Sequence, residues 1–290
     1  MARKLEDKFI ADLKDGELKK FLELVHKDDT LDLEIRENYI NIYYRGGSID
    51  KIDYKDGKYQ HYFDPNYLGG KSIEEITTDK FPEMKQAMDL YEKKQIEKEF
   101  QQLIVRENNY SKIANSTDYY IADIEYQIGD NSRFDMIAVK WESESSKRKK
   151  GDNLELAVVE VKYGDVALAD DSGIISHLKK AKDIKIESLQ EEMKHCFNQK
   201  IELGLIPDLS HKAENFKQEK IDFIFILINH DPSSSILRKE LDKIDEKDYP
   251  NLNIKFAVSN FAGYALFKEN IYSLEEFKKK FEKNILNKPL

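Results

Sequence analysis

Two hydrophobic periods succeed one another in the N-terminal part of the chain. Apolar side chains recur at helical spacing over residues 5–26, and Gly16 marks the point where this helix would break. Over residues 31–63 apolar and polar residues alternate instead, as they do in half-buried strands. Two turns, Gly46-Gly47 and Asp56-Gly57, divide this stretch. The pattern therefore predicts a helix followed by a small β-meander.

A domain boundary is expected after the meander. Asp64-Pro65 and Gly69-Gly70 interrupt the pattern there. A long helix is then expected over residues 82–108, because proline at its start suits the first turn of a helix. These features predict an N-terminal domain of residues 1–80 and a larger domain of residues 81–290.

The larger domain has the pattern of a mixed α/β fold. After the long helix come three strands, a helical stretch over residues 172–203 and a fourth strand. Residues 154–162 and 221–228 are apolar on both faces, which is typical of central strands. A capping box, Ser273-Leu274-Glu275-Glu276, heads the last helix. The expected strands are 119–128, 133–141, 154–162, 221–228, 254–259 and 264–267.

Composition narrows the class of protein. The chain has 290 residues, of which 36% are charged, and its 12 glycines and 6 prolines are too few for a collagen-like or low-complexity chain. No apolar run approaches the ~20 residues of a membrane span, and the charged start has no signal-peptide stretch. A single cysteine, Cys196, excludes an internal disulfide framework. We therefore expect a cytoplasmic protein that does not enter a membrane.

Charge and histidine content leave only some ligand classes open. The net charge of −9 is not typical of a basic nucleic-acid binder, although the local potential of a cleft matters more than this sum. The six histidines are dispersed and do not have zinc spacing. A site in which carboxylates hold a hard cation stays open.

The third strand of the larger domain is apolar along most of its length and carries charged residues at its end. Strand geometry puts Glu160 and Lys162 on one face, about 7 Å apart along the chain, while Val161 points the other way. Such charges are costly at the end of a central strand unless they are solvated, paired or bound to an ion. If the preceding strand forms a hairpin with this one, Asp135 lies beside Glu160. Two carboxylates and the Val161 carbonyl would form an oxygen site suited to Mg²⁺ or Mn²⁺.

On these residues the chain resembles the PD-(D/E)XK nuclease superfamily. Asp135 matches the acidic residue of the second strand, and Glu160-Val161-Lys162 matches the (Asp/Glu)-x-Lys of the third. The order of elements is similar to the restriction-endonuclease-like αβββαβ core, over roughly residues 90–230. Phe134 stands where the pattern has its proline. Residues 1–80 match no domain of known role.

The resemblance implies a metal-dependent nuclease, with DNA favoured over RNA as substrate. Asp135, Glu160 and the Val161 carbonyl would hold Mg²⁺ or Mn²⁺. Glu99 on the first core helix would be a further ligand, with Glu97 as its competitor. Lys162 would position the attacking water and offset developing negative charge.

The resemblance also suggests a setting. It implies an endonuclease in bacterial-type restriction, defence or repair, working alone, as a homodimer or with a protein partner. The alternatives are a nuclease-fold module that binds or regulates without cutting, and a nuclease subunit that needs a partner. The alternative to a functional site is that Glu160 and Lys162 form an ordinary solvated strand end.

Four residues of the following helical stretch are candidates for substrate contacts. His177 could touch a phosphate, although such a histidine is more often a plain polar helix residue. Lys179 and Lys180 could contact backbone phosphates or belong to a solvated surface. Gln190 weakly resembles a helix glutamine of exonuclease-like branches of the superfamily.

Overall fold

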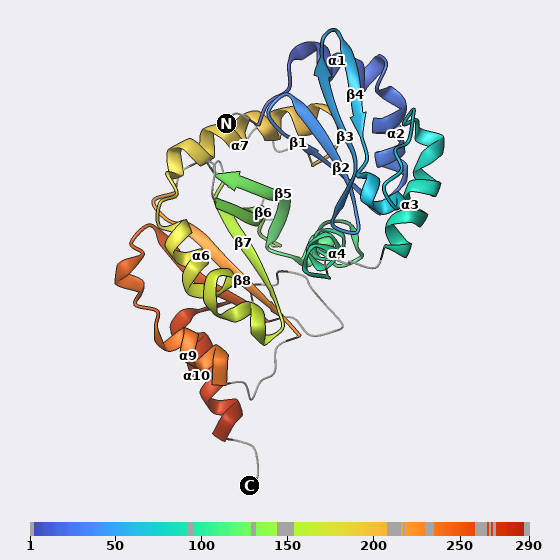
Figure 1. Ribbon diagram of the computed structural model, residues 1–290. Coiled ribbons are helices and arrows are strands. Elements are labelled where there is room, and N and C mark those ends of the chain that lie inside the picture. Colours follow the sequence, from blue (N-terminus) through green and yellow to red (C-terminus); the bar gives the residue numbers. More distant parts are fainter. Residues whose placement is uncertain are drawn as a thin grey trace. The chain divides into compact units, whose positions relative to one another are not determined.

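The computed structural model divides the chain into two compact units (Figure 1). It describes residues 3–91, 96–128, 132–143, 154–207, 216, 218–229, 235–258, 266, 268 and 271–286. The first unit comprises residues 1–106 and 191–214, and the second comprises residues 107–190 and 215–290. The first unit is therefore larger than the expected domain of residues 1–80. Whether residues 1–80 form a domain by themselves stays a prediction.

The first unit is built on the meander that the alternating pattern predicts. Its four-stranded sheet has the order β1-β2-β3-β4, and every neighbouring pair is antiparallel. Phe9 and Phe21 from the two preceding helices pack against Tyr59 and His61 of β4. The N-terminal helix breaks at Gly16, as expected. The elements up to the second unit are α1 (Asp7–Asp15), α2 (Lys19–Lys27), β1 (Leu31–Ile35), β2 (Tyr39–Tyr44), β3 (Gly47–Lys55), β4 (Lys58–Tyr62), η1 (Pro65–Leu68), η2 (Thr78–Lys80), α3 (Phe81–Leu90) and α4 (Ile96–Tyr110).

Two tight turns of the same kind join the strands of the meander. Arg45 and Gly46 have φ angles of 48° and 76°, and Asp56 and Gly57 have 53° and 78°. These left-handed pairs match the right-handed twist of a hairpin. The surroundings of the two glycines differ. A Cβ on Gly46 would lie 2.4 Å from the backbone carbon of Lys98 in α4, whereas a Cβ on Gly57 would meet nothing within 4 Å.

Gly46→Ala is expected to destabilise the protein more than Gly57→Ala. Both substitutions force a left-handed alanine, which costs roughly 1–2 kcal/mol. Only Gly46→Ala also drives a methyl group into helix backbone, which adds roughly 1–3 kcal/mol. Urea denaturation of the two variants gives the comparison. Equal losses of unfolding free energy would mean that the turn does not pack tightly on α4.

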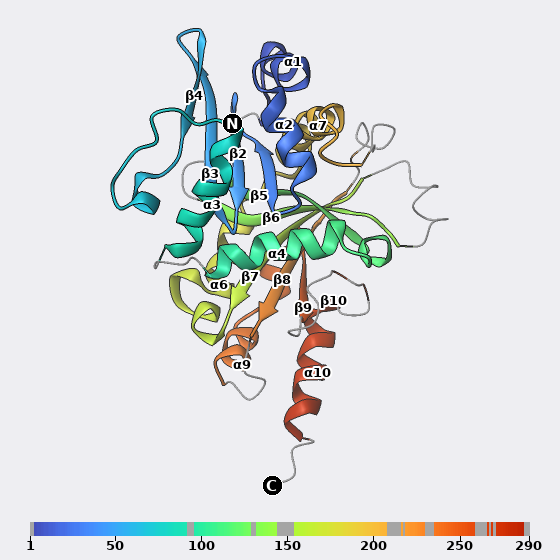
Figure 2. The same cartoon turned by 90° about the vertical axis from the view of Figure 1, so that its right-hand side faces the viewer.

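The second unit contains a mixed sheet. Among the described residues it has six strands in the order β10-β9-β8-β7-β6-β5. β7, β8 and β9 are parallel, and the other neighbouring pairs are antiparallel. Both views show α6 beside β7 and β8 (Figures 1 and 2). Its elements, with α7 continuing into the first unit, are η3 (Ala114–Ser116), β5 (Tyr119–Ile128), β6 (Ser132–Lys140), β7 (Leu156–Tyr163), η4 (Asp165–Leu168), η5 (Asp170–Ser172), α6 (Ile174–Ala181), α7 (Ile186–Glu202), β8 (Ile221–Ile228), α9 (Ser235–Asp242), η6 (Glu246–Asp248), β9 (Leu252–Val258), β10 (Ile271–Ser273) and α10 (Leu274–Leu286).

Most expected elements of this unit are present, and the mixed α/β class is confirmed. β7 and β8 lie at the centre of the sheet because their side chains are apolar on both faces. The capping box of α10 forms: Ser273 N donates to Glu276 Oε2 at 2.9 Å, and Glu276 N donates to Ser273 Oγ at 3.3 Å. The strand expected at 264–267 lies largely outside the described residues, and α9 and β10 were not expected. No helix in the described ranges is long and apolar enough to cross a membrane.

Candidate functional site

Asp135 and Glu160 come together where β6 and β7 separate. Met136 pairs with Val159 in the antiparallel register, and continuing that register puts Asp135 opposite Glu160. At this point a side chain replaces the backbone pairing between the two strands. The Oδ2 of Asp135 accepts a hydrogen bond from the Val161 backbone N–H at 2.7 Å. Asp135 therefore lies next to Glu160 and Val161, as the sequence predicts.

Glu160 lies in a buried cluster of charged and polar groups. Its exposed fraction is 1%, and that of Lys162 is 2%. Lys162 Nζ donates to Glu160 Oε1 at 2.8 Å. His177 Nδ1, which α6 places over this face, lies 2.8 Å from the same oxygen, although its N–H is not aligned on it. Within the part of the chain that the structure describes, Glu160 Oε2 is buried and has no hydrogen-bond partner.

The cluster keeps Glu160 ionised. Burial alone would raise the pKa of its carboxyl group. The interaction with His177 and the positive charge of Lys162 outweigh this effect and leave the pKa below its ordinary value of 4.5. Glu160 is thus a buried carboxylate with Lys162 and His177 beside one oxygen and no hydrogen bond on the other among the described residues.

Glu160 is expected to stabilise the fold at neutral pH and to lose this contribution in acid. Since its pKa is lower in the folded than in the unfolded state, the contribution is complete above about pH 4.5 and declines as the pH falls through the folded-state value. The measurement is the difference in unfolding free energy between the wild type and Glu160→Gln in EDTA, at pH 7 and near pH 3. The difference should shrink at the lower pH. A difference that stays constant would contradict a stabilising ionised form.

Two further carboxylates on the same sheet were missed by the sequence interpretation. Asp123 pairs with Ile137, so the register puts it on the face that carries Asp135 and Glu160; its exposed fraction is 1%. Glu125 stands opposite Asp135, between two regular pairs of β5 and β6, with a left-handed φ of 52° and an ion pair to Arg133 at 3.0 Å. Acidic residues two apart within an apolar strand were the signal that could have found them.

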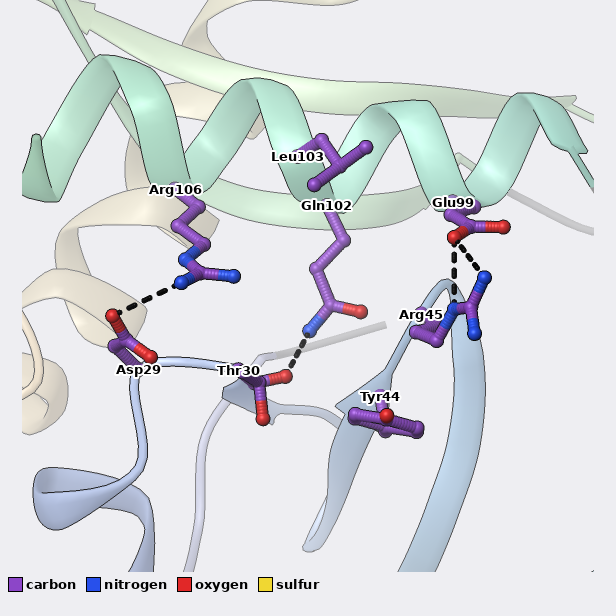
Figure 3. A pocket seen from close by; sticks show the side chains of 8 residues that line it. All are labelled: Asp29, Thr30, Tyr44, Arg45, Glu99, Gln102, Leu103 and Arg106. Carbon is purple, nitrogen blue, oxygen red and sulfur yellow. Dashed lines mark hydrogen bonds and ion pairs between the residues drawn. The ribbon is translucent and has the colours of Figure 1, made fainter. Parts of the chain in front are cut away.

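Glu99 belongs to the first unit, where an arginine binds it. Arg45 Nε donates to its Oε1 at 2.8 Å, and Arg45 Nη1 donates to Asp89 at 2.6 Å. Figure 3 shows Glu99 on α4, facing the end of β2 across a pocket of about 220 Å³. The side chains shown to contact Glu160 are Lys162 and His177. The expected role of Glu99 as a metal ligand stays a prediction, as does that of Glu97.

The other candidates for substrate contacts differ in their surroundings. His177 is buried and lies against Glu160, and the phosphate contact expected of it stays a prediction. Lys179 is exposed and Lys180 is partly exposed at the end of α6. Gln190 lies on α7, and its Nε2 is buried with no hydrogen-bond partner among the described residues. Substrate binding by the two lysines and Gln190 stays a prediction.

The carboxylates of this arrangement bear on the hard cation that the sequence predicts. In the described parts of the chain, no group of three His, Cys, Asp or Glu side chains stands close enough to hold a metal ion. Mg²⁺, however, often binds through one or two carboxylates, with water and substrate phosphate as the remaining ligands. Asp135 and Glu160 are the two carboxylates here that could hold such an ion.

Comparisons with known proteins identify no relative of this chain. No protein-family model, no curated protein and no solved structure matches the chain.

Proposed function

We propose that the second unit is a metal-dependent nuclease of the PD-(D/E)XK type. The observation that carries the proposal is the buried, ionised Glu160, with Lys162 on one of its oxygens and Asp135 across from it on β6. A buried carboxylate with an open oxygen is costly unless a cation or a hydrogen bond compensates it. Asp135, Glu160 and Lys162 are the residue types that the superfamily uses, at the corresponding strand positions.

The order of the elements supports the proposal. α4, β5, β6, β7, the α6–α7 pair and β8 follow one another as α-β-β-β-α-β. The strand that carries Glu160 lies between an antiparallel neighbour, β6, and a parallel neighbour, β8. This is the arrangement expected of a restriction-endonuclease-like core.

The residues divide the chemistry between them. Asp135, Glu160 and the Val161 carbonyl would hold Mg²⁺ or Mn²⁺, which supplies an activated water and neutralises charge on the scissile phosphate. The Lys162 ammonium group orients the Glu160 carboxylate, and it would offset charge that develops on the phosphate. Four parts of the proposal rest on the resemblance alone. They are DNA as the substrate, endonuclease action, a cytoplasmic location, and a restriction, defence or repair setting.

A catalytically silent nuclease fold is the second candidate. Glu160 and Lys162 are almost fully buried and pair with each other, as a purely structural ion pair would. The net charge of −9 agrees with a module that binds a protein rather than nucleic acid.

Cleavage assays separate the two functions. The full chain is incubated with supercoiled plasmid, linear duplex DNA, single-stranded DNA and RNA, in Mg²⁺, Mn²⁺ or EDTA. A nuclease cuts at least one substrate, and only with metal. Absence of both cutting and Mn²⁺ binding would favour the silent module.

A further inference from the structure

We infer that His177 is a positioning residue that fixes the Glu160 carboxylate so that Oε2 is the oxygen presented to the cation. The inference rests on the proposed function and goes beyond the residues of the superfamily pattern. His177 comes from α6, outside the two strands that carry Asp135 and Glu160.

The two groups that contact Glu160 restrain it differently. Lys162 lies two residues along the same strand, so its Nζ moves with β7 and reaches Oε1 through a flexible stem. His177 approaches the same oxygen from the helix, with a short ring-bearing side chain that is 10% exposed. The imidazole therefore ties the carboxylate to a second element. With both neighbours on Oε1, the open atom is Oε2.

A ligand that is held this way loses less freedom when it binds metal. Glutamate has three side-chain torsions, and fixing them in advance favours binding. Groups that orient a metal ligand from behind typically change metal affinity or activity by about 10- to 100-fold when they are removed. The N–H of His177 is not aligned on Oε1 in the structure, and such contacts often tighten only when the site is filled.

The inference is tested with His177→Leu, His177→Asn and His177→Gln in the full chain. Asparagine places its amide nitrogen where Nδ1 stands, and glutamine places it nearer to Nε2. Mn²⁺ affinity is measured by calorimetry and cleavage is measured in parallel. We expect about tenfold or greater loss of Mn²⁺ affinity in His177→Leu and His177→Gln, and recovery to within about threefold of the wild type in His177→Asn. His195→Leu is the control, since the His195 side chain is 45% exposed and pairs with Glu191 on its own helix.

The outcomes separate this inference from the proposed function. If the wild type binds Mn²⁺ and His177→Leu binds it equally well, His177 does not position Glu160. If His177→Leu does not fold, the asparagine and glutamine variants decide the question, and equal behaviour of the two would overturn the inference. If the wild type binds no Mn²⁺, the proposed function fails and takes the inference with it.

Discussion

Glu160→Gln is expected to lower metal-dependent cleavage by roughly 100- to 1000-fold, the loss that follows when one group stabilising transition-state charge is removed. The substitution keeps the shape of the side chain, and its amide oxygen can still accept the hydrogen bond from Lys162. What disappears is the negative charge that would face the proposed cation. Plasmid cleavage rates and Mn²⁺ titrations of the same preparations measure the effect.

Glutamine is a better probe here than alanine. In the structure Lys162 is 2% exposed and donates to Glu160, so alanine would leave a buried ammonium group without this acceptor. We therefore expect a clear loss of stability for Glu160→Ala and a smaller one for Glu160→Gln.

Glu155→Gln is the matched control. Glu155 immediately precedes β7, is 48% exposed and pairs with Lys140 at 3.0 Å. Its loss should leave cleavage and Mn²⁺ binding at the wild-type level, because exposed ion pairs contribute little. Wild-type cleavage by Glu160→Gln would assign Glu160 to structure alone and would contradict its role as a metal ligand.

The strands around the site could be predicted because their signals are local. A run that is apolar on both faces can only be satisfied at the centre of a sheet, and this placed β7 and β8 correctly. The proximity of Asp135 and Glu160 needed one more assumption, that β6 and β7 form a hairpin. Since the period of a strand is two residues, that assumption was enough to put both carboxylates on one face.

The contact between His177 and Glu160 could not be predicted in the same way. It depends on the rotation of α6 and on how that helix packs on the sheet. The face of α6 that carries His177 also carries Ile174, Leu178 and Ala181, which are fully buried. A histidine on an apolar helix face has no sequence signal that distinguishes a site residue from a core residue, so the tertiary contact decides.

The C-terminal part of α7 belongs to the first unit, and no local pattern in the sequence indicates this either. Gln199 donates to the Leu5 carbonyl at 2.7 Å and accepts from the Leu5 N–H at 2.8 Å. Lys200 Nζ donates to Glu34 Oε2 at 2.6 Å. These partners are separated by more than half of the chain. Removing residues 1–80 would therefore strip buried polar groups of α7 of their partners, which the expected boundary at residue 80 did not foresee.

Lys200→Met is expected to lower the free energy of unfolding by about 3 kcal/mol, the scale for removing one partner of a buried ion pair. Lys200 is 2% exposed and Glu34 is 5% exposed, so the remaining carboxylate would stay in the interior. Arg36 Nη1 stands 3.6 Å from the same Glu34 oxygen and would compensate in part. Methionine keeps most of the volume of the lysine stem, so the loss reports the charge rather than a cavity. Urea denaturation at neutral pH gives the value.

Lys14→Met separates this effect from a general loss of surface charge. Lys14 pairs with Glu202 at 2.9 Å in the same unit, but the two side chains are 42% and 48% exposed. Its loss should cost less than about 1 kcal/mol, because water solvates and screens both partners. If Lys200→Met were no more destabilising than Lys14→Met, Glu34 would have to find water or Arg36 as a full substitute. The C-terminal part of α7 would then be held to the first unit by its apolar side chains and by Gln199, and not by the buried ion pair.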